Sequence, residues 1–163
     1  MKKLYYDVKK CLGCKSCEMA CAITHSISGD LAKAIKEGKI SLPRKKILLS
    51  KDKNYPIACI HCKDPKCVDA CIASALVYDK EKGMVIQDEK KCVGCWMCVM
   101  VCPYGAIRPN LRAKVPVRCD LCKDKDKPSC VIACPTHAII YEEDKSPHPL
   151  KTNGLGVKKE GAG

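Results

Sequence analysis

Sixteen cysteines constrain this chain of 163 residues more than any other feature. They fall into four blocks of four with none left over, and such internal repetition indicates a repeated structural unit. Phe is absent and Trp occurs once, so the large aromatic side chains that usually dominate core burial are scarce. The four blocks, in chain order, are Cys11, Cys14, Cys17 and Cys21; Cys59, Cys62, Cys67 and Cys71; Cys92, Cys95, Cys98 and Cys102; and Cys119, Cys122, Cys130 and Cys134.

The cellular compartment decides whether such cysteines form disulfides or bind metal. The N-terminal residues are basic but lack the apolar run of a secretory signal, and no apolar run approaches the 18 residues of a transmembrane helix. We therefore expect a cytoplasmic protein with no transmembrane segment. In a reducing compartment, closely spaced cysteines indicate metal ligands.

The spacing within the blocks indicates which metal. Block 3, CxxCxxCxxxC followed by Pro103, is the full run that binds [4Fe–4S] clusters in bacterial ferredoxins, and block 1 has the same ligand spacing. Three thiolates at two-residue intervals can reach one face of a cluster from a tight loop, and Gly13 and Gly94 allow that loop to curl. The sequence therefore predicts four [4Fe–4S] clusters, with all sixteen cysteines as ligands.

The charge and the motifs leave one alternative of another class. The formal net charge of +12 is compatible with nucleic-acid binding, but four clusters would offset about 8 to 12 positive charges. A zinc-bound nucleic-acid-binding module is the alternative, although a zinc ribbon would not need the third cysteine of blocks 1 and 3. No P-loop, GxGxxG run or Ser-His-Asp set occurs, so we expect no substrate site and no enzymatic activity in this chain.

Several local elements can be predicted between the blocks. Residues 30–37 form an expected helix, with Ser28 or Asp30 as N-cap, Gly38 as its end and a role as a lid over a cluster. A turn over 79–83 predicts a hairpin into 84–86, and short helices are expected just before the last cysteine of each block. Short apolar runs predict strands over 75–78, 106–108 and 138–141.

Two groups of polar residues have simpler roles. We expect His61 to orient its loop by hydrogen bonding, since sixteen cysteines already supply sixteen ligands. Two basic runs, 44–46 and 123–127, form either a solvated surface or a patch that steers a negatively charged partner.

The blocks together resemble the four-cluster ferredoxin-like subunits that transfer electrons in molybdenum oxidoreductases, formate dehydrogenases and hydrogenases. Segments 59–67 (CIHCKDPKC) and 118–122 (RCDLC) resemble the family's second and fourth blocks. One departure is Ile72 after Cys71, where relatives often have Pro. Within the family, segments 14–26 and 94–107 are most similar to the electron-transfer partner of nickel carbon-monoxide dehydrogenase.

This resemblance implies a function and a set of partners. The chain would relay electrons from a catalytic redox protein, carbon-monoxide dehydrogenase first and formate dehydrogenase or hydrogenase as alternatives. The acceptor would be a hydrogenase, a flavoprotein or a ferredoxin. No nucleic-acid partner is implied.

The resemblance also implies an α+β fold of two pseudo-symmetric ferredoxin-like lobes, with short helices and β-hairpins around four clusters. Residues 1–51 and 112–143 would form the outer lobe, 52–111 the inner lobe and 144–163 a flexible tail. Blocks would pair as 1 with 4 and 2 with 3, although spacing alone equally allows 1 with 2 and 3 with 4. The implied ligand sets are Cys11, Cys14, Cys17 and Cys134; Cys119, Cys122, Cys130 and Cys21; Cys59, Cys62, Cys67 and Cys102; and Cys92, Cys95, Cys98 and Cys71.

Overall fold

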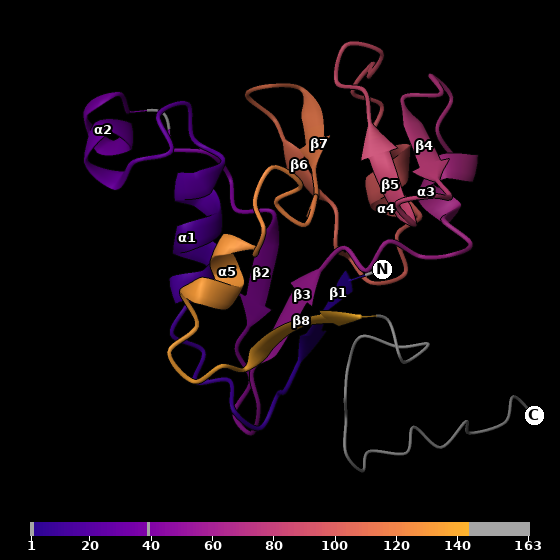
Figure 1. The fold of residues 1–163 in the computed structure, drawn as a ribbon. Coiled ribbons are helices and arrows are strands. Elements are labelled where there is room, and N and C mark those ends of the chain that lie inside the picture. Colours follow the sequence, from indigo (N-terminus) through magenta and orange to yellow (C-terminus); the bar gives the residue numbers. More distant parts are fainter. Residues whose placement is uncertain (1, 39, 144–163) are drawn as a thin grey trace, which may run out of the picture.

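The structure, a computed structural model, describes residues 2–38 and 40–143, and the predicted flexible tail lies outside these residues. Within them the chain forms short helices and two-stranded antiparallel sheets (Figure 1). The predicted α+β class with short helices and hairpins is therefore confirmed.

The strands of the described residues form four antiparallel pairs. Strand β1 (Lys2–Tyr6) pairs with β8 (Ile139–Glu143), so the two ends of the described chain lie together (Figure 1). The strand expected at 75–78 and its hairpin are confirmed as β4 and β5, and the strand expected at 138–141 is confirmed as β8. The strand expected at 106–108 begins two residues later, and β1, β2, β3 and β7 were not predicted. The three hairpins are β2 (Lys45–Leu48) with β3 (Tyr55–Ala58), β4 (Leu76–Asp79) with β5 (Met84–Gln87), and β6 (Arg108–Asn110) with β7 (Val115–Val117).

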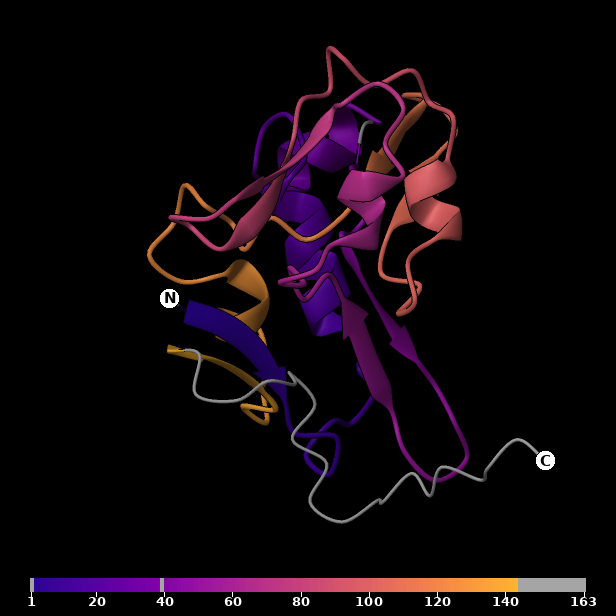
Figure 2. The same ribbon diagram turned by 90° about the vertical axis from the view of Figure 1, so that its right-hand side faces the viewer.

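Each cysteine block carries a helix. As predicted, α3 (Lys66–Asp69), α4 (Met97–Met100) and α5 (Ser129–Ile132) end shortly before the last cysteine of blocks 2, 3 and 4. Helix α1 (Ser16–Thr24) instead contains Cys17 and Cys21 and continues beyond them. Helix α1 contacts α5, and α3 contacts α4 (Figures 1 and 2). Helical contacts thus bring block 1 to block 4 and block 2 to block 3.

The fifth helix, α2 (Leu31–Lys36), projects at the edge of the molecule (Figure 1). Its predicted N-cap is confirmed, because the Asp30 carboxylate accepts a hydrogen bond from the Lys33 N–H at 3.0 Å. Its predicted role as a lid over a cluster stays a prediction. Ala34 is fully buried, whereas Leu31 and Ile35 are 44% and 59% exposed, so only part of the apolar face of this helix packs against the described chain.

Buried side chains form two separate groups. The first core joins β1, β2, β3 and β8 to cysteines of blocks 1 and 4 and to Cys59 of block 2, and its apolar members include Leu4, Tyr6 and Ile47. The second core joins β4 and β5 to the cysteines of blocks 2 and 3, around Leu76 and Val85. Cysteine side chains make up much of both cores, as the scarcity of large aromatic residues predicts.

Candidate metal centres

Two cavities are each lined by four cysteines. One lies between the first loop and β8 and is lined by Cys11, Cys14, Cys17 and Cys134. The other lies beside α3 and is lined by Cys59, Cys62, Cys67 and Cys102. In each cavity, three cysteines of one block meet the last cysteine of another. Apolar side chains such as Ile47 and Ile107 complete the two walls.

Several of the remaining eight cysteines lie close to one another. Cys21 interacts electrostatically with Cys122 and Cys130, which places the last cysteine of block 1 among those of block 4. Cys98 and Cys71 both belong to the second core, whereas Cys95 is exposed.

Backbone N–H groups point at the last cysteine of three blocks. The Ala75 N–H donates to Cys71 Sγ at 3.3 Å, and the Ala138 N–H donates to Cys134 Sγ at 3.2 Å. In block 1 the helix continues past Cys21, and the donor is instead the Arg44 N–H at 3.3 Å. Such N–H donors stabilise the negative charge of a metal-bound thiolate.

The loops of blocks 1 and 3 repeat the same backbone conformation. Gly13 and Gly94 have φ of +69° and +70°, as the sequence predicts, and Lys15 and Trp96 have φ of +58° and +64° at the position before each helix. A Cβ on Gly94 would lie 2.5 Å from the Lys114 carbonyl oxygen, so this loop can approach its neighbour only without a side chain.

Burial affects the thiols in a consistent way. It raises the pKa of Cys17, Cys59 and Cys98 to about 11 each, so these thiols hold their protons at neutral pH in the absence of metal. Coordination to a metal removes such protons. The residues fit an iron–sulfur cluster, because each cavity offers four soft sulfur donors in a mostly apolar wall and N–H donors face several of the sulfurs.

His61 has the role that was predicted for it. Its side chain is 1% exposed, and its Nδ1 accepts a hydrogen bond from the Val85 N–H at 3.1 Å. Burial, with the nearby Arg118 guanidinium, lowers the pKa of His61 to about 4, so the imidazole is neutral. This bond ties the block 2 loop to β5.

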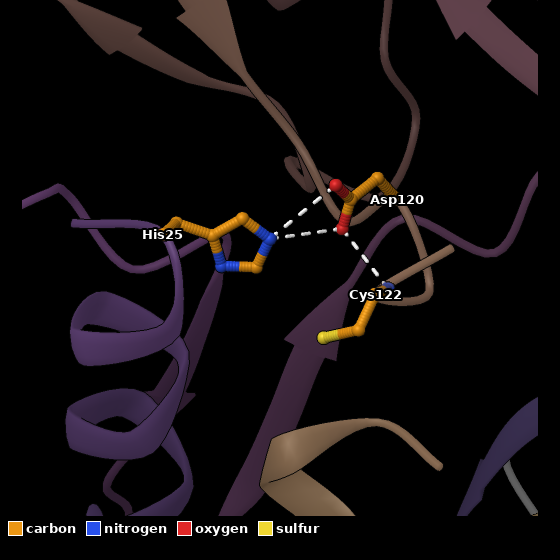
Figure 3. Close-up of side chains that lie close together, drawn as sticks. All are labelled: His25, Asp120 and Cys122. Atoms are coloured by element: carbon orange, nitrogen blue, oxygen red, sulfur yellow. Dashed lines mark hydrogen bonds and ion pairs between the residues drawn. The ribbon is translucent and has the colours of Figure 1, made fainter. Parts of the chain in front are cut away.

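A polar cluster that the sequence did not predict lies beside block 4. The Nε2 of His25 lies 3.1 and 3.3 Å from the two carboxylate oxygens of Asp120, which also accepts a hydrogen bond from the Cys122 N–H (Figure 3). Arg44 forms an ion pair with the same carboxylate, and His25 Nδ1 lies 2.8 Å from the Cys21 carbonyl oxygen. The cluster thereby joins the end of α1, the segment before β2 and the block 4 loop.

The charges in this cluster support one another. Burial alone would raise the pKa of Asp120, but its bond to His25 and the charge of Arg44 lower it to about 2. Burial would likewise lower the pKa of His25, but the bonds to Asp120 and Cys21 raise it to about 9. His25, Asp120 and Cys122 place ligand atoms within 4.8 Å of one another, as a metal site would. Because Arg44 and His25 already occupy the carboxylate, we interpret the cluster as a clamp between segments.

The two basic runs differ in exposure. Lys123, Lys125 and Lys127 are exposed, as a solvated surface requires. Lys45, in contrast, is only 2% exposed, so the expectation that it belongs to a surface patch is wrong. The reason is strand alternation, since Lys45 and Ile47 share the inward face of β2 while Lys46 faces outward.

No helix in the described residues is long and apolar enough to cross a membrane.

Comparison with known proteins finds a family model and several relatives that match this chain. Residues 51–144 match the model of the 4Fe-4S dicluster domain. The chain is 37% identical over 150 residues to "Electron transport protein HydN" of Escherichia coli (strain K12), covering 82% of this chain and 83% of that protein. It is 32% identical to a protein named as a subunit of the tetrathionate reductase of Salmonella typhimurium, covering 87% of this chain and 58% of that protein.

A solved structure shares the fold. The chain aligns with a structure described as "Active site complex BamBC of Benzoyl Coenzyme A reductase as isolated" with a TM-score of 0.51 and 20% sequence identity, over 87% of this chain and 76% of the other.

Proposed function

The chain belongs to the 4Fe-4S dicluster family, carries [4Fe–4S] clusters and is an electron-transfer protein, and we propose that it relays electrons through four clusters between a catalytic redox protein and a separate acceptor. The observation that carries this proposal is the pair of cavities in which three cysteines of one block meet the last cysteine of another. In two-cluster ferredoxins, likewise, the last cysteine of each run ligates the cluster held by the other run.

We propose the nested ligand sets. The two cavities support the sets that contain Cys134 and Cys102 as crossing ligands. The proximity of Cys21 to Cys122 and Cys130 supports the third set, and the shared core of Cys71 and Cys98 supports the fourth. In this arrangement residues 1–51 with 112–143 form one ferredoxin-like lobe, and 52–111 form its pseudo-symmetric counterpart.

When bound, a [4Fe–4S] cluster accepts and releases an electron at a potential that its protein surroundings set. The residues of this chain hold those surroundings in place. The N–H groups of Ala75, Ala138 and Arg44 stabilise thiolate charge, and His61 fixes the block 2 loop against β5. Asp120 ties the block 4 loop to α1 through His25.

We propose that the partner is the catalytic component of a redox enzyme and that this chain has no substrate site of its own. The similarity to a protein named as part of tetrathionate reductase supports a role within an enzyme complex, and the similarity to a protein named as an electron transport protein supports a carrier. Segments 14–26 and 94–107 resemble the electron-transfer partner of nickel carbon-monoxide dehydrogenase, and this resemblance favours that enzyme as the donor. A formate dehydrogenase, hydrogenase or molybdenum oxidoreductase is the alternative. The reduced state that sixteen cysteines require favours the cytoplasm.

The first experiment is metal analysis of anaerobically purified protein. About 16 iron and 16 sulfide per chain, with an electron paramagnetic resonance spectrum of interacting clusters after reduction, is the expected result. About four zinc and no sulfide would overturn the proposal and indicate the nucleic-acid-binding module.

The partner is tested separately. Affinity-tagged chain, recovered anaerobically from cells of its source organism, should bring with it a catalytic redox enzyme that reduces the clusters when given its substrate. Reduction with carbon monoxide supports the dehydrogenase proposed first, and reduction with formate or hydrogen supports the alternatives. Reduction without any second protein would contradict the non-enzymatic role.

A further inference from the structure

A lysine is buried in the first core without a partner for its charge. Lys45 is 2% exposed, and its Nζ lies 4.8 Å from the centroid of the Tyr6 ring. This Nζ makes no hydrogen bond, and no ion pair with a carboxylate is found for it among the described residues. A contact with an aromatic face contributes too little to balance the desolvation of an ammonium group. Another negative group is needed beside it.

The groups next to Lys45 are cysteine sulfurs, which become negative when they bind metal. Lys45 lies on the buried face of β2 with Ile47, which packs in the first core with Cys17, Cys119 and Cys130, and the charge of Lys45 acts on each of these three sulfurs. Cys17 belongs to one proposed ligand set of the first core, and Cys119 and Cys130 belong to the other. Lys45 therefore faces both sets.

A buried arginine, Arg118, repeats this situation for the cysteines of blocks 2 and 3. Arg118 is 5% exposed, and its Nη1 and Nη2 have no hydrogen-bond partner. Although it directly precedes Cys119, its charge acts on Cys59 and Cys67 of block 2 and on Cys98 of block 3. A guanidinium cannot lose its proton in a protein, so this positive charge is permanent.

We propose that Lys45 and Arg118 are fixed positive charges that stabilise the reduced clusters, Lys45 for the two sites of the first core and Arg118 for the two sites of the second. The inference rests on the proposed function. Reduction adds one negative charge at a site, and in a buried, weakly screened environment a cation favours the more negative state. Each residue thus raises the reduction potential of the sites it faces, and the two residues act on different pairs.

The test replaces each cation and measures reduction potentials by electron paramagnetic resonance-monitored titration. Lys45→Met is compared with Lys46→Met, which removes the same charge from the adjacent, exposed position of β2. Arg118→Met is compared with Arg112→Met, which removes an exposed charge from the loop between β6 and β7. Lys45→Arg and Arg118→Lys retain the charge. Iron and sulfide are quantified in every variant.

We expect Lys45→Met to lower the equilibrium constant for reduction of two sites by at least tenfold, equivalent to about 59 mV for one electron. Arg118→Met should shift the other two sites, and the charge-retaining and surface variants should stay close to wild type. Equal potentials in Lys45→Met and Lys46→Met, with full iron content, would overturn the inference for Lys45, and equal potentials in the two arginine variants would overturn it for Arg118.

Loss of clusters in a neutral variant is also informative. If Lys45→Met fails to bind iron, the proposal requires Lys45→Arg to restore iron binding, and failure to do so assigns Lys45 a packing role and overturns its part of the inference. The same comparison applies to Arg118→Met and Arg118→Lys. A wild-type protein without iron and sulfide would contradict the proposed function itself, which is a separate outcome.

Discussion

Around the first core, five of the eight cysteines of blocks 1 and 4 are buried, whereas around the second core Cys98 is the single buried cysteine among the eight of blocks 2 and 3. The loops themselves are alike, since Gly13 and Gly94 share the same backbone conformation. The two cores differ in the helices and strands that pack over them. The nine-residue helix α1 and the β1–β8 sheet lie over the first core, while the four-residue helices α3 and α4 lie over the second.

Most of this difference lies between blocks 4 and 2, because three cysteines are buried in block 4 and none in block 2, whereas blocks 1 and 3 differ only at their last cysteine. The spacing determines which sulfurs can converge, but the length of the neighbouring elements determines how much water reaches them. The first core can bury Tyr6 and Ile47 in addition to sulfur, so side-chain packing contributes more to its stability. We therefore expect the second core to depend more heavily on the metal that its cysteines bind.

Metal removal is the strongest way to test this comparison. We expect iron-free protein to lose cooperative folding, because the binding free energy of a metal site built into a small core is folding free energy. Amide hydrogen exchange should show that β4 and β5 lose protection before β1 and β8. Protection of β4 and β5 that survives iron removal would contradict the view that the second core depends on metal.

The second prediction concerns the crossing of the blocks. Cys21→Ser should remove about four of about sixteen iron atoms and disturb the site of block 4, because Cys21 lies beside Cys122 and Cys130. Cys71→Ser, its counterpart in the second core, should disturb the site of block 3. Iron analysis and the spectra of the reduced variants are the measurements. A Cys21→Ser change confined to the block 2 site would instead support the sequential pairing.

The third prediction tests the clamp that only the first core has. Asp120→Ala removes the group that joins His25, Arg44 and the Cys122 N–H, and we expect a loss of about 1.5–3 kcal/mol in unfolding free energy. Denaturant unfolding under anaerobic conditions measures it. Asp126→Ala, an exposed change in the same loop, is the control and should have little effect. Equal stability of the two variants would show that the clamp contributes nothing.

The smallest expected effect is a difference in stability between substitutions of Gly13 and Gly94, which occupy matching positions in the loops of blocks 1 and 3. Both Gly13→Ala and Gly94→Ala cost about 1–2 kcal/mol for a left-handed residue with a side chain. The new methyl of Gly94→Ala would meet the Lys114 carbonyl, which is backbone, whereas that of Gly13→Ala would meet the side chains of Leu49 and Asn54, which can move. Gly94→Ala should therefore be less stable by about a further 1 kcal/mol in the same assay. A reversed order would show that the loops differ in a way that their backbone does not reveal.

Local features were the ones that could be predicted from sequence. The N-cap at Asp30, the hairpin from β4 to β5 and the helices before the last cysteines of blocks 2, 3 and 4 depend on neighbouring residues and were confirmed. The packing of α2 was predicted only in part, because a short amphipathic pattern does not show how much of the apolar face a neighbour covers.

Long-range features could not be predicted in the same way. Pairing of β1 with β8 joins residues more than 130 positions apart, and the contact between His25 and Asp120 spans 95 positions. The burial of Lys45 did leave a signal, because it alternates with Ile47 along β2, but a basic run first suggests a surface. A buried lysine becomes reasonable only when the neighbouring sulfurs are known.

The sequence by itself determined the chemistry of this protein, because the ferredoxin spacing of its cysteines indicates [4Fe–4S] clusters without any fold. Only the tertiary structure decided which blocks meet, how deeply each set of sulfurs is buried and which charges face it. Ligand spacing is a property of a few adjacent residues, whereas burial and electrostatic surroundings are produced by segments that are distant in the chain and come together only on folding.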